Sequence, residues 1–293
     1  MKKLFIIATV GLTALACSKT IDTPDASGRQ IAIQASIGPM SKVATTGNQS
    51  VFQEGDKLSL YAWTGSTTAV STPLVVNGVK NTLGEGDKWT PEIQMLWADM
   101  VSPHYFIGVS PARTVTDFTA DAYTLDPADY EASDLLIATN MAGLKAQDDP
   151  VTLAFDHVLA KLYVNLSFRN QWSEEPTVTA VTATACKTAT VDYLTKAFTA
   201  TGAAAPVALT ASANNAWSGL QVPQAGVNTI TVTVEGHDYV YTHTADIPLQ
   251  GGKYTTVNLV IGRDQINLAS EITISDWASQ GDAIGGDVFK PAE

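Results

Sequence analysis

The chain has 293 residues, with 17 Lys and Arg against 29 Asp and Glu and a formal net charge of −12. So acidic a chain offers few cations to exchange for phosphate counterions and is repelled by anionic lipid, which argues against nucleic-acid partners and basic membrane contacts. Apolar residues make up 45% of the chain and charged residues 16%, so the chain can bury a core. At about 150 residues per domain, its length predicts two domains.

The N-terminus predicts export and lipidation. A basic start, Met1-Lys2-Lys3, precedes an apolar run that ends just before Cys17. That run of about 13 residues suits a signal peptide and is too short to span a bilayer. Because Ala14-Leu15-Ala16-Cys17 is similar to a lipobox, we expect cleavage between Ala16 and Cys17 and palmitate-type acylation of Cys17. An ordinary secretory signal is the alternative.

These features divide the N-terminal region into a lipoprotein signal peptide over 1–16 and a flexible tether over 17–29, which is polar and contains Pro and Gly. The expected location is the cell outer membrane and cell surface, with outer-membrane lipid as the partner of Cys17.

Strand signals recur along the rest of the chain, and Thr and Val, which favour strands, are common. Alternation of period two predicts strands at 31–37, 58–63, 104–109, 151–155, 162–168, 229–234, 239–243, 254–261 and 272–277. The cleanest case is 229–234, where Thr alternates with Ile and Val before a turn, which predicts a hairpin with 239–243. Residues 111–135 are expected to form a short helix or a long loop.

The expected fold is therefore all-β, built as sandwiches. We place the boundary near Ala160, between two predicted strands. This gives an N-terminal β-sandwich over 30–160 and a C-terminal β-sandwich over 161–293.

Catalytic and metal-binding patterns are weak. Phosphate-loop, nucleophile-elbow and zinc-protease motifs are absent from the sequence, so we expect no enzyme, no cofactor and no metal site. His237 and His243 would lie about 20 Å apart on one hairpin arm, too far to share a metal. Six acids between Asp117 and Asp134 leave calcium as an alternative to a solvated acidic surface.

The six tryptophans allow two interpretations of their role. Exposed indole rings stack on sugars, whereas buried ones fill a core or an interface. The residues concerned are Trp63, Trp89, Trp97, Trp172, Trp217 and Trp277.

A series of segments carries a family resemblance. They are FQEGDKLSLYA at 52–62, KWTP at 88–91, LW at 96–97, YFI at 105–107, DLLIA at 134–138, VTLAFDHVLAKL at 151–162, GGKYT at 251–255 and ITISDW at 272–277. In order and spacing the chain resembles the fimbrillin-like (minor-fimbrium, Mfa-like) lipoproteins of the Bacteroidia, the subunits of type V pili.

The resemblance implies two tandem transthyretin-like β-sandwich domains in a lipid-anchored precursor. It also implies assembly by donor-strand exchange, in which a protease removes an N-terminal segment and a neighbour's terminal strand fills the groove. Asp156-His157 and Trp277 would then be fold signatures.

Arg29 is the candidate processing site, because it precedes the first predicted strand. The alternative is displacement of the strand at 30–37, with Lys42 as a later cut. At the other end, the tail over 279–293 is the candidate donor strand, with Ile284, Val288 and Phe289 as its apolar side chains.

The expected function is thus a structural or adhesive subunit of a fimbria, with other fimbrial subunits and a host or glycan receptor as partners. Stalk, tip and anchor positions stay open. The alternative is a monomeric surface lipoprotein that binds a glycan or host ligand without polymerising.

Overall fold

The computed structural model describes residues 29–38, 51–212 and 215–276. Strands dominate, and in these ranges the helices are α1 (Tyr130–Ser133) and one short 3-10 turn (Glu85–Asp87). The all-β prediction is therefore confirmed, and α1 falls in the stretch expected to hold a short helix or loop.

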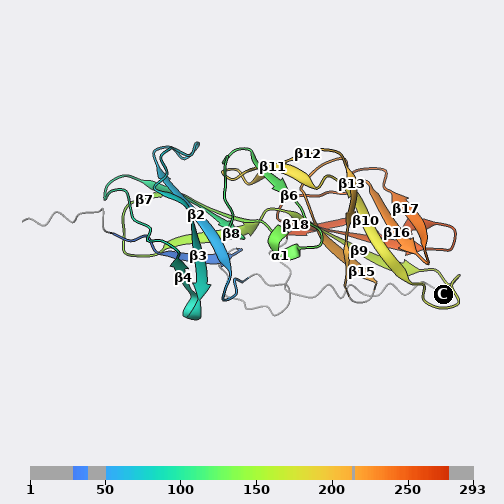
Figure 1. Ribbon diagram of the computed structural model, residues 1–293. Helices are drawn as coiled ribbons and strands as arrows, with labels where there is room; N and C mark the ends of the chain where they lie inside the picture. The colour runs from blue at the N-terminus through green and yellow to red at the C-terminus, as the bar shows by residue number, and fades with distance from the viewer. Residues whose placement is uncertain (1–28, 39–50, 213–214, 277–293) are drawn as a thin grey trace, which may run out of the picture.

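One large sheet forms one end of the molecule (Figure 1). Its seven strands run in the order β1-β8-β7-β5-β2-β3-β4. Their bounds are β1 Ile33–Ile37, β2 Lys57–Thr64, β3 Val76–Gly84, β4 Lys88–Pro91, β5 His104–Ser110, β7 Leu136–Leu144 and β8 Val151–His157.

Three further sheets form the other end (Figure 1). The six-stranded sheet has the order β14-β15-β9-β18-β19, with β20 also paired to β18. Its bounds are β9 Ala160–Phe168, β14 Thr210–Ala211, β15 Ala216–Gln221, β18 Lys253–Ile261, β19 Ile266–Leu268 and β20 Thr273–Asp276.

The remaining two sheets are smaller. A four-stranded sheet runs β13-β10-β16-β17, and a three-stranded sheet runs β12-β11-β6. Their bounds are β6 Asp121–Thr124, β10 Val178–Ala185, β11 Thr188–Asp192, β12 Ala197–Thr201, β13 Ala205–Ala208, β16 Thr229–Val234 and β17 His237–Thr242.

The chain leaves the seven-stranded sheet at the end of β8 and enters the six-stranded sheet at the start of β9. One strand departs from this division: β6 precedes β8 in the chain, yet it pairs with β11. The two ends of the molecule are therefore also connected through this strand. The division into 30–160 and 161–293 as tandem transthyretin-like domains stays a prediction.

Two buried clusters use opposite faces of the large sheet. Along β2, Leu60 and Ala62 belong to the cluster inside the seven-stranded end, whereas Tyr61 and Trp63 join the larger cluster that continues through the rest of the molecule. All four are at most 1% exposed. A strand buried on both faces explains why 58–63 is almost continuously apolar.

Each predicted strand has a counterpart in the structure, and the predicted hairpin is β16–β17. Its turn is Glu235-Gly236, in which both residues have positive φ, the geometry of a type I′ turn. The remaining described strands have no predicted counterpart: β3, β4, β6, β7, β10 to β15 and β19.

Candidate functional site

The first segment that the structure describes pairs with two separate parts of the chain at the seven-stranded end of the molecule. Over 33–37 it runs parallel to β8, with Ile33 opposite Val151 and Ile37 opposite Phe155. Just before β1, Gln30 forms an antiparallel bridge with Leu96. We call residues 29–37 the closing segment, because they pair with β8 on one side and with residues 95–97 on the other.

Main-chain hydrogen bonds fasten the closing segment at both flanks. The Ile31 amide donates to the Met95 carbonyl at 2.8 Å, and the Trp97 amide donates to the Arg29 carbonyl at 3.1 Å. On the other flank, the Val151 amide donates to the Ala32 carbonyl at 2.8 Å. Removing the segment would leave these donors and acceptors unpaired on β8 and on residues 95–97, which is costly unless another strand replaces them.

Alternate side chains of the closing segment enter the core. Ile31 and Ile33 are 3% and 7% exposed, and Ala35 and Ile37 pack against the same cluster. The cluster also contains Trp97 and the aromatic and aliphatic residues of the large sheet. Burying an isoleucine contributes about 1.5–3 kcal/mol, so the segment is held by a few such residues and by its ladder.

Arg29 is anchored on the folded surface. Its guanidinium donates to the Asp148 carboxylate at 2.8 Å and to the Ala146 carbonyl at 3.3 Å. Because its own carbonyl is also hydrogen-bonded, the Arg29–Gln30 peptide bond lies at the edge of a β-ladder. The sequence predicted a site here from a basic residue before a strand; it offered no signal for Asp148, which is 119 residues away.

The other predicted site residues fall outside the described ranges. They are Ala16, Cys17, Lys42, Ile284, Val288 and Phe289, together with Trp277. Signal cleavage, lipidation and strand donation at these positions stay predictions.

The acidic stretch between 117 and 134 is divided among separate structural contacts. The Asp117 carboxylate accepts from Thr119, and Asp129 caps α1 by accepting from the Ala132 amide at 3.0 Å. Asp134 lies 3.0 Å from His157. Among the residues the structure describes, no group of three or more His, Cys, Asp or Glu side chains is arranged to hold a metal ion.

Asp121 is the buried member of that stretch and joins the two ends of the molecule. It is 4% exposed and accepts hydrogen bonds from the Thr116 hydroxyl at 2.9 Å and the Tyr193 hydroxyl at 3.1 Å. Arg113 lies 3.5 Å away. The Tyr61 hydroxyl of β2 donates to the Arg113 carbonyl at 2.9 Å, so this network connects the large sheet to the three-stranded sheet.

The tryptophans mostly belong to the core. Trp63, Trp89 and Trp97 are 0–7% exposed, and Trp172 and Trp217 are partly buried against the larger cluster. These five rings therefore do not form an exposed stacking platform. In the described part of the chain, no helix is both long and apolar enough to cross a membrane.

Comparison with known proteins identifies the family. The sequence matches the family model described as fimbrillin-like over residues 42–277, whereas no curated protein sequence matches it.

The fold is similar to that of several solved structures. A protein from Bacteroides ovatus with a suggested role in cell adhesion has a TM-score of 0.65 at 15% identity, over 85% of this chain and 98% of that one. A similar protein from Bacteroides uniformis has a TM-score of 0.64 at 20% identity, over 85% and 99%. A fimbrial protein from Bacteroides vulgatus has a TM-score of 0.51 at 11% identity, over 85% and 99%. The family model covers most of the sequence, and the chain belongs to the fimbrillin-like family.

Proposed function

We propose that this protein is a structural or adhesive subunit of a pilus on the cell surface and that it assembles by strand exchange at the closing segment. The observation that carries the proposal is the position of residues 29–37. They supply one strand between two partners, and they enter the core through only a few alternate side chains. Membership of the fimbrillin-like family and the fimbrial protein among its structural neighbours support the pilus assignment.

If the closing segment left its place, it would leave a groove that an added strand could fill, for two reasons. The amides and carbonyls along β8 would lack partners, and the pockets of Ile31, Ile33 and Ile37 would be exposed to water. An added strand supplies main-chain hydrogen bonds for affinity and alternate side chains for specificity.

The tail over 279–293 offers a matching pattern. Ile284, Gly286 and Val288 occupy alternate positions, so they present large, small and large side chains to one face of a strand. Ile33, Ala35 and Ile37 present the same order in the closing segment. We propose that the tail of one subunit occupies these three positions in the next, with Phe289 directed to the opposite face.

Processing at Arg29 alone would leave β1 in place, because the strand begins four residues later. Opening the groove therefore needs either displacement of β1 by the donor or a cut beyond it, for which Lys42 is the candidate. Lipid attachment at Cys17 would hold the precursor at the outer membrane, and a Cys17→Ser variant should be released from membrane fractions.

Assembly is tested on material sheared from the cell surface and run in SDS with and without boiling. A ladder that collapses on boiling is expected, and deletion of 279–293 should abolish it while the monomer remains folded. A single monomer band from the intact chain, or a ladder that survives the deletion, would contradict donation by the tail.

A further inference from the structure

Both groups by which a protease would recognise Arg29 are bound within the folded chain. A trypsin-like protease takes an arginine side chain into an acidic pocket and binds the carbonyl oxygen of the bond that it cuts with main-chain amides of its own. The Arg29 guanidinium instead donates to the Asp148 carboxylate at 2.8 Å and to the Ala146 carbonyl at 3.3 Å. The Arg29 carbonyl accepts from the Trp97 amide at 3.1 Å. In this position the Arg29–Gln30 bond offers a protease neither group.

The residues that follow the bond are also held. The Ile31 amide donates to the Met95 carbonyl at 2.8 Å, and the Ile31 side chain is 3% exposed. Gln30 between them is exposed. The protection of this bond therefore comes from the pairing of its main chain and from the anchors on either side, and not from burial of Gln30.

The stretch 95–97, which pairs with the bond, is itself fixed in the core. Trp97 is 2% exposed, and its ring packs edge-on against the His104 ring, with 4.9 Å between the ring centroids. The Ala98 amide donates to His104 Nε2 at 3.1 Å, and His104 is 0% exposed. Because this stretch is packed in place, the closing segment is the part that must move to free the bond.

These contacts bear on the order of processing and assembly. We propose that the folded chain shields the Arg29–Gln30 bond, so that a protease cuts there only after residues 29–31 have separated from residues 95–97. The proposal rests on strand exchange at the closing segment and adds a sequence of events, in which the segment separates first and is cut second. A donor strand that displaces β1 would thereby expose the bond, so that cutting follows engagement of the neighbouring subunit.

The test compares trypsin cleavage after Arg29 in the full chain, purified in detergent, with cleavage of a synthetic peptide that spans residues 23–36. Arg29 is the one basic residue in that peptide, and intact mass identifies the fragment of the chain that begins at Gln30. The rate in the folded chain follows the population of the open form. Because hydrogen bonds and the buried Ile31 side chain keep the segment closed, cleavage in the chain should be at least about thirtyfold slower than in the peptide.

Two variants weaken the shield through different contacts. Asp148→Ala frees the guanidinium and should speed cleavage about two- to fivefold, the range of a surface ion pair. Ile31→Ala removes a buried anchor and should speed it at least about tenfold, relative to a peptide with the same change. Asp149→Ala is the matched control. It removes the next carboxylate along the chain, which is not one of the groups that hold the Arg29 guanidinium, and should leave the rate unchanged.

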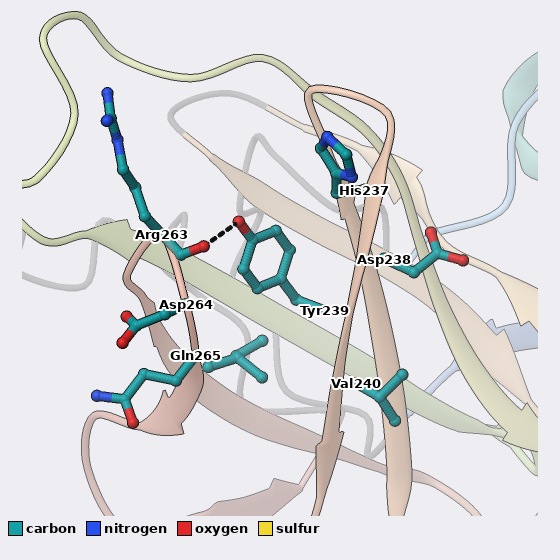
Figure 2. Close-up of a pocket in the computed structure, with 8 residues that line it drawn as sticks. His237, Asp238, Tyr239, Val240, Arg263, Asp264 and Gln265 are labelled. Atoms are coloured by element: carbon teal, nitrogen blue, oxygen red, sulfur yellow. Dashed lines mark hydrogen bonds between the residues drawn. The ribbon is translucent and has the colours of Figure 1, made fainter.

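A second arginine reports opening elsewhere in the molecule. Arg263 lies in the turn between β18 and β19, where its amide donates to Gln171 Oε1 at 3.0 Å. Figure 2 shows that its carbonyl accepts from the Tyr239 hydroxyl, at 2.9 Å. Cleavage after Arg263 therefore requires opening of the C-terminal end, and it should keep its wild-type rate in every variant.

Slow cleavage after Arg29 in the folded chain, with a rise in Asp148→Ala and Ile31→Ala but not in the control, supports the proposal. Equal rates in the chain and the peptide, unchanged rates in the two variants, or a parallel rise after Arg263 would overturn it. The assay reads one bond in the monomer. A chain that is shielded as expected but forms no SDS-resistant ladder would therefore contradict strand exchange and not the shield.

Discussion

The described residues contain two parallel strand pairs, and their surroundings differ. β9 and β18 pair over eight positions, from Lys161–Tyr254 to Phe168–Ile261, at the centre of the six-stranded sheet. β1 and β8 pair over five positions at the end of the seven-stranded sheet. β9 and β18 each have a further strand on the outer side, whereas β1 is bridged on its outer side only just before it begins, by Gln30.

Under the proposed assembly, one fold contains both a fixed and an exchangeable strand. β9 cannot leave without breaking ladders on both sides and the core of the C-terminal end. The closing segment can leave while the other six strands of its sheet remain paired. We propose that the same parallel pairing is structural in the β9–β18 pair and serves assembly in the β1–β8 pair.

A carboxylate placed in the β9–β18 pair should destabilise the protein far more than one placed in the β1–β8 pair. Val257 of β18 is 0% exposed, and an unpaired charge there costs several kcal/mol, comparable to the 5–15 kcal/mol that stabilises a typical domain. Val257→Asp should abolish the cooperative thermal transition measured by circular dichroism. Ile33→Asp should leave that transition in place and raise hydrogen exchange mainly over 29–37. Complete unfolding by Ile33→Asp would erase the distinction between the two pairs.

The next effect concerns the connection between the two ends. Asp121→Asn keeps the shape of the side chain but removes its charge opposite Arg113 and weakens its hydrogen bonds to Thr116 and Tyr193. We expect a loss of about 1–3 kcal/mol in urea unfolding. Asp149→Asn, an exposed acid elsewhere, is the control. An unchanged urea midpoint would mean that the buried network does not stabilise the junction.

A smaller effect should appear at alkaline pH. Burial raises the pKa of Tyr123 and Tyr193 above the ordinary value of 10, so the folded state favours their neutral forms. Stability from this source is complete below pH 10 and falls as the pH rises further, because the unfolded chain then releases protons first. Tyrosine absorbance should therefore show a fraction that ionises only with unfolding. Full ionisation near pH 10 in a folded chain would contradict these burials.

The smallest effect is expected at Arg29. Its partner Asp148 has an 80% exposed side chain, and surface ion pairs contribute about 0–1 kcal/mol. Arg29→Ala and Asp148→Ala should each shift the urea midpoint only slightly, and the double variant should show a coupling below about 1 kcal/mol. A larger coupling would mean that this pair, and not the ladder, holds the closing segment.

Local pattern predicted much of this fold, because alternation of apolar residues reports burial on one face of a strand. Ile31 and Ile33 indicated a strand, and the Thr–Val alternation at 229–234 indicated a hairpin. β3, β4, β6, β7, β10 to β15 and β19 were not predicted. In β10 to β14 the reason is that Ala and Thr side chains carry little apolar contrast.

Contacts between segments far apart in the chain could not be predicted from the sequence. Nothing local to Ile33 indicates Val151 as its parallel neighbour. Trp63 and Trp97 could fill a core or bind sugar until the packing around them was known.

The most direct measurement locks the closing segment with a disulfide. Gln34 and Thr152 are register partners and both exposed, and neighbouring strands bring Cα atoms within disulfide range. In a Cys186→Ser background, Gln34→Cys with Thr152→Cys should give an SDS-resistant ladder when reduced and none when oxidised. The matched pair Thr190→Cys with Thr199→Cys, across β11 and β12, should form ladders in both states. Equal ladders from the reduced and oxidised Gln34–Thr152 variant would contradict exchange at the closing segment.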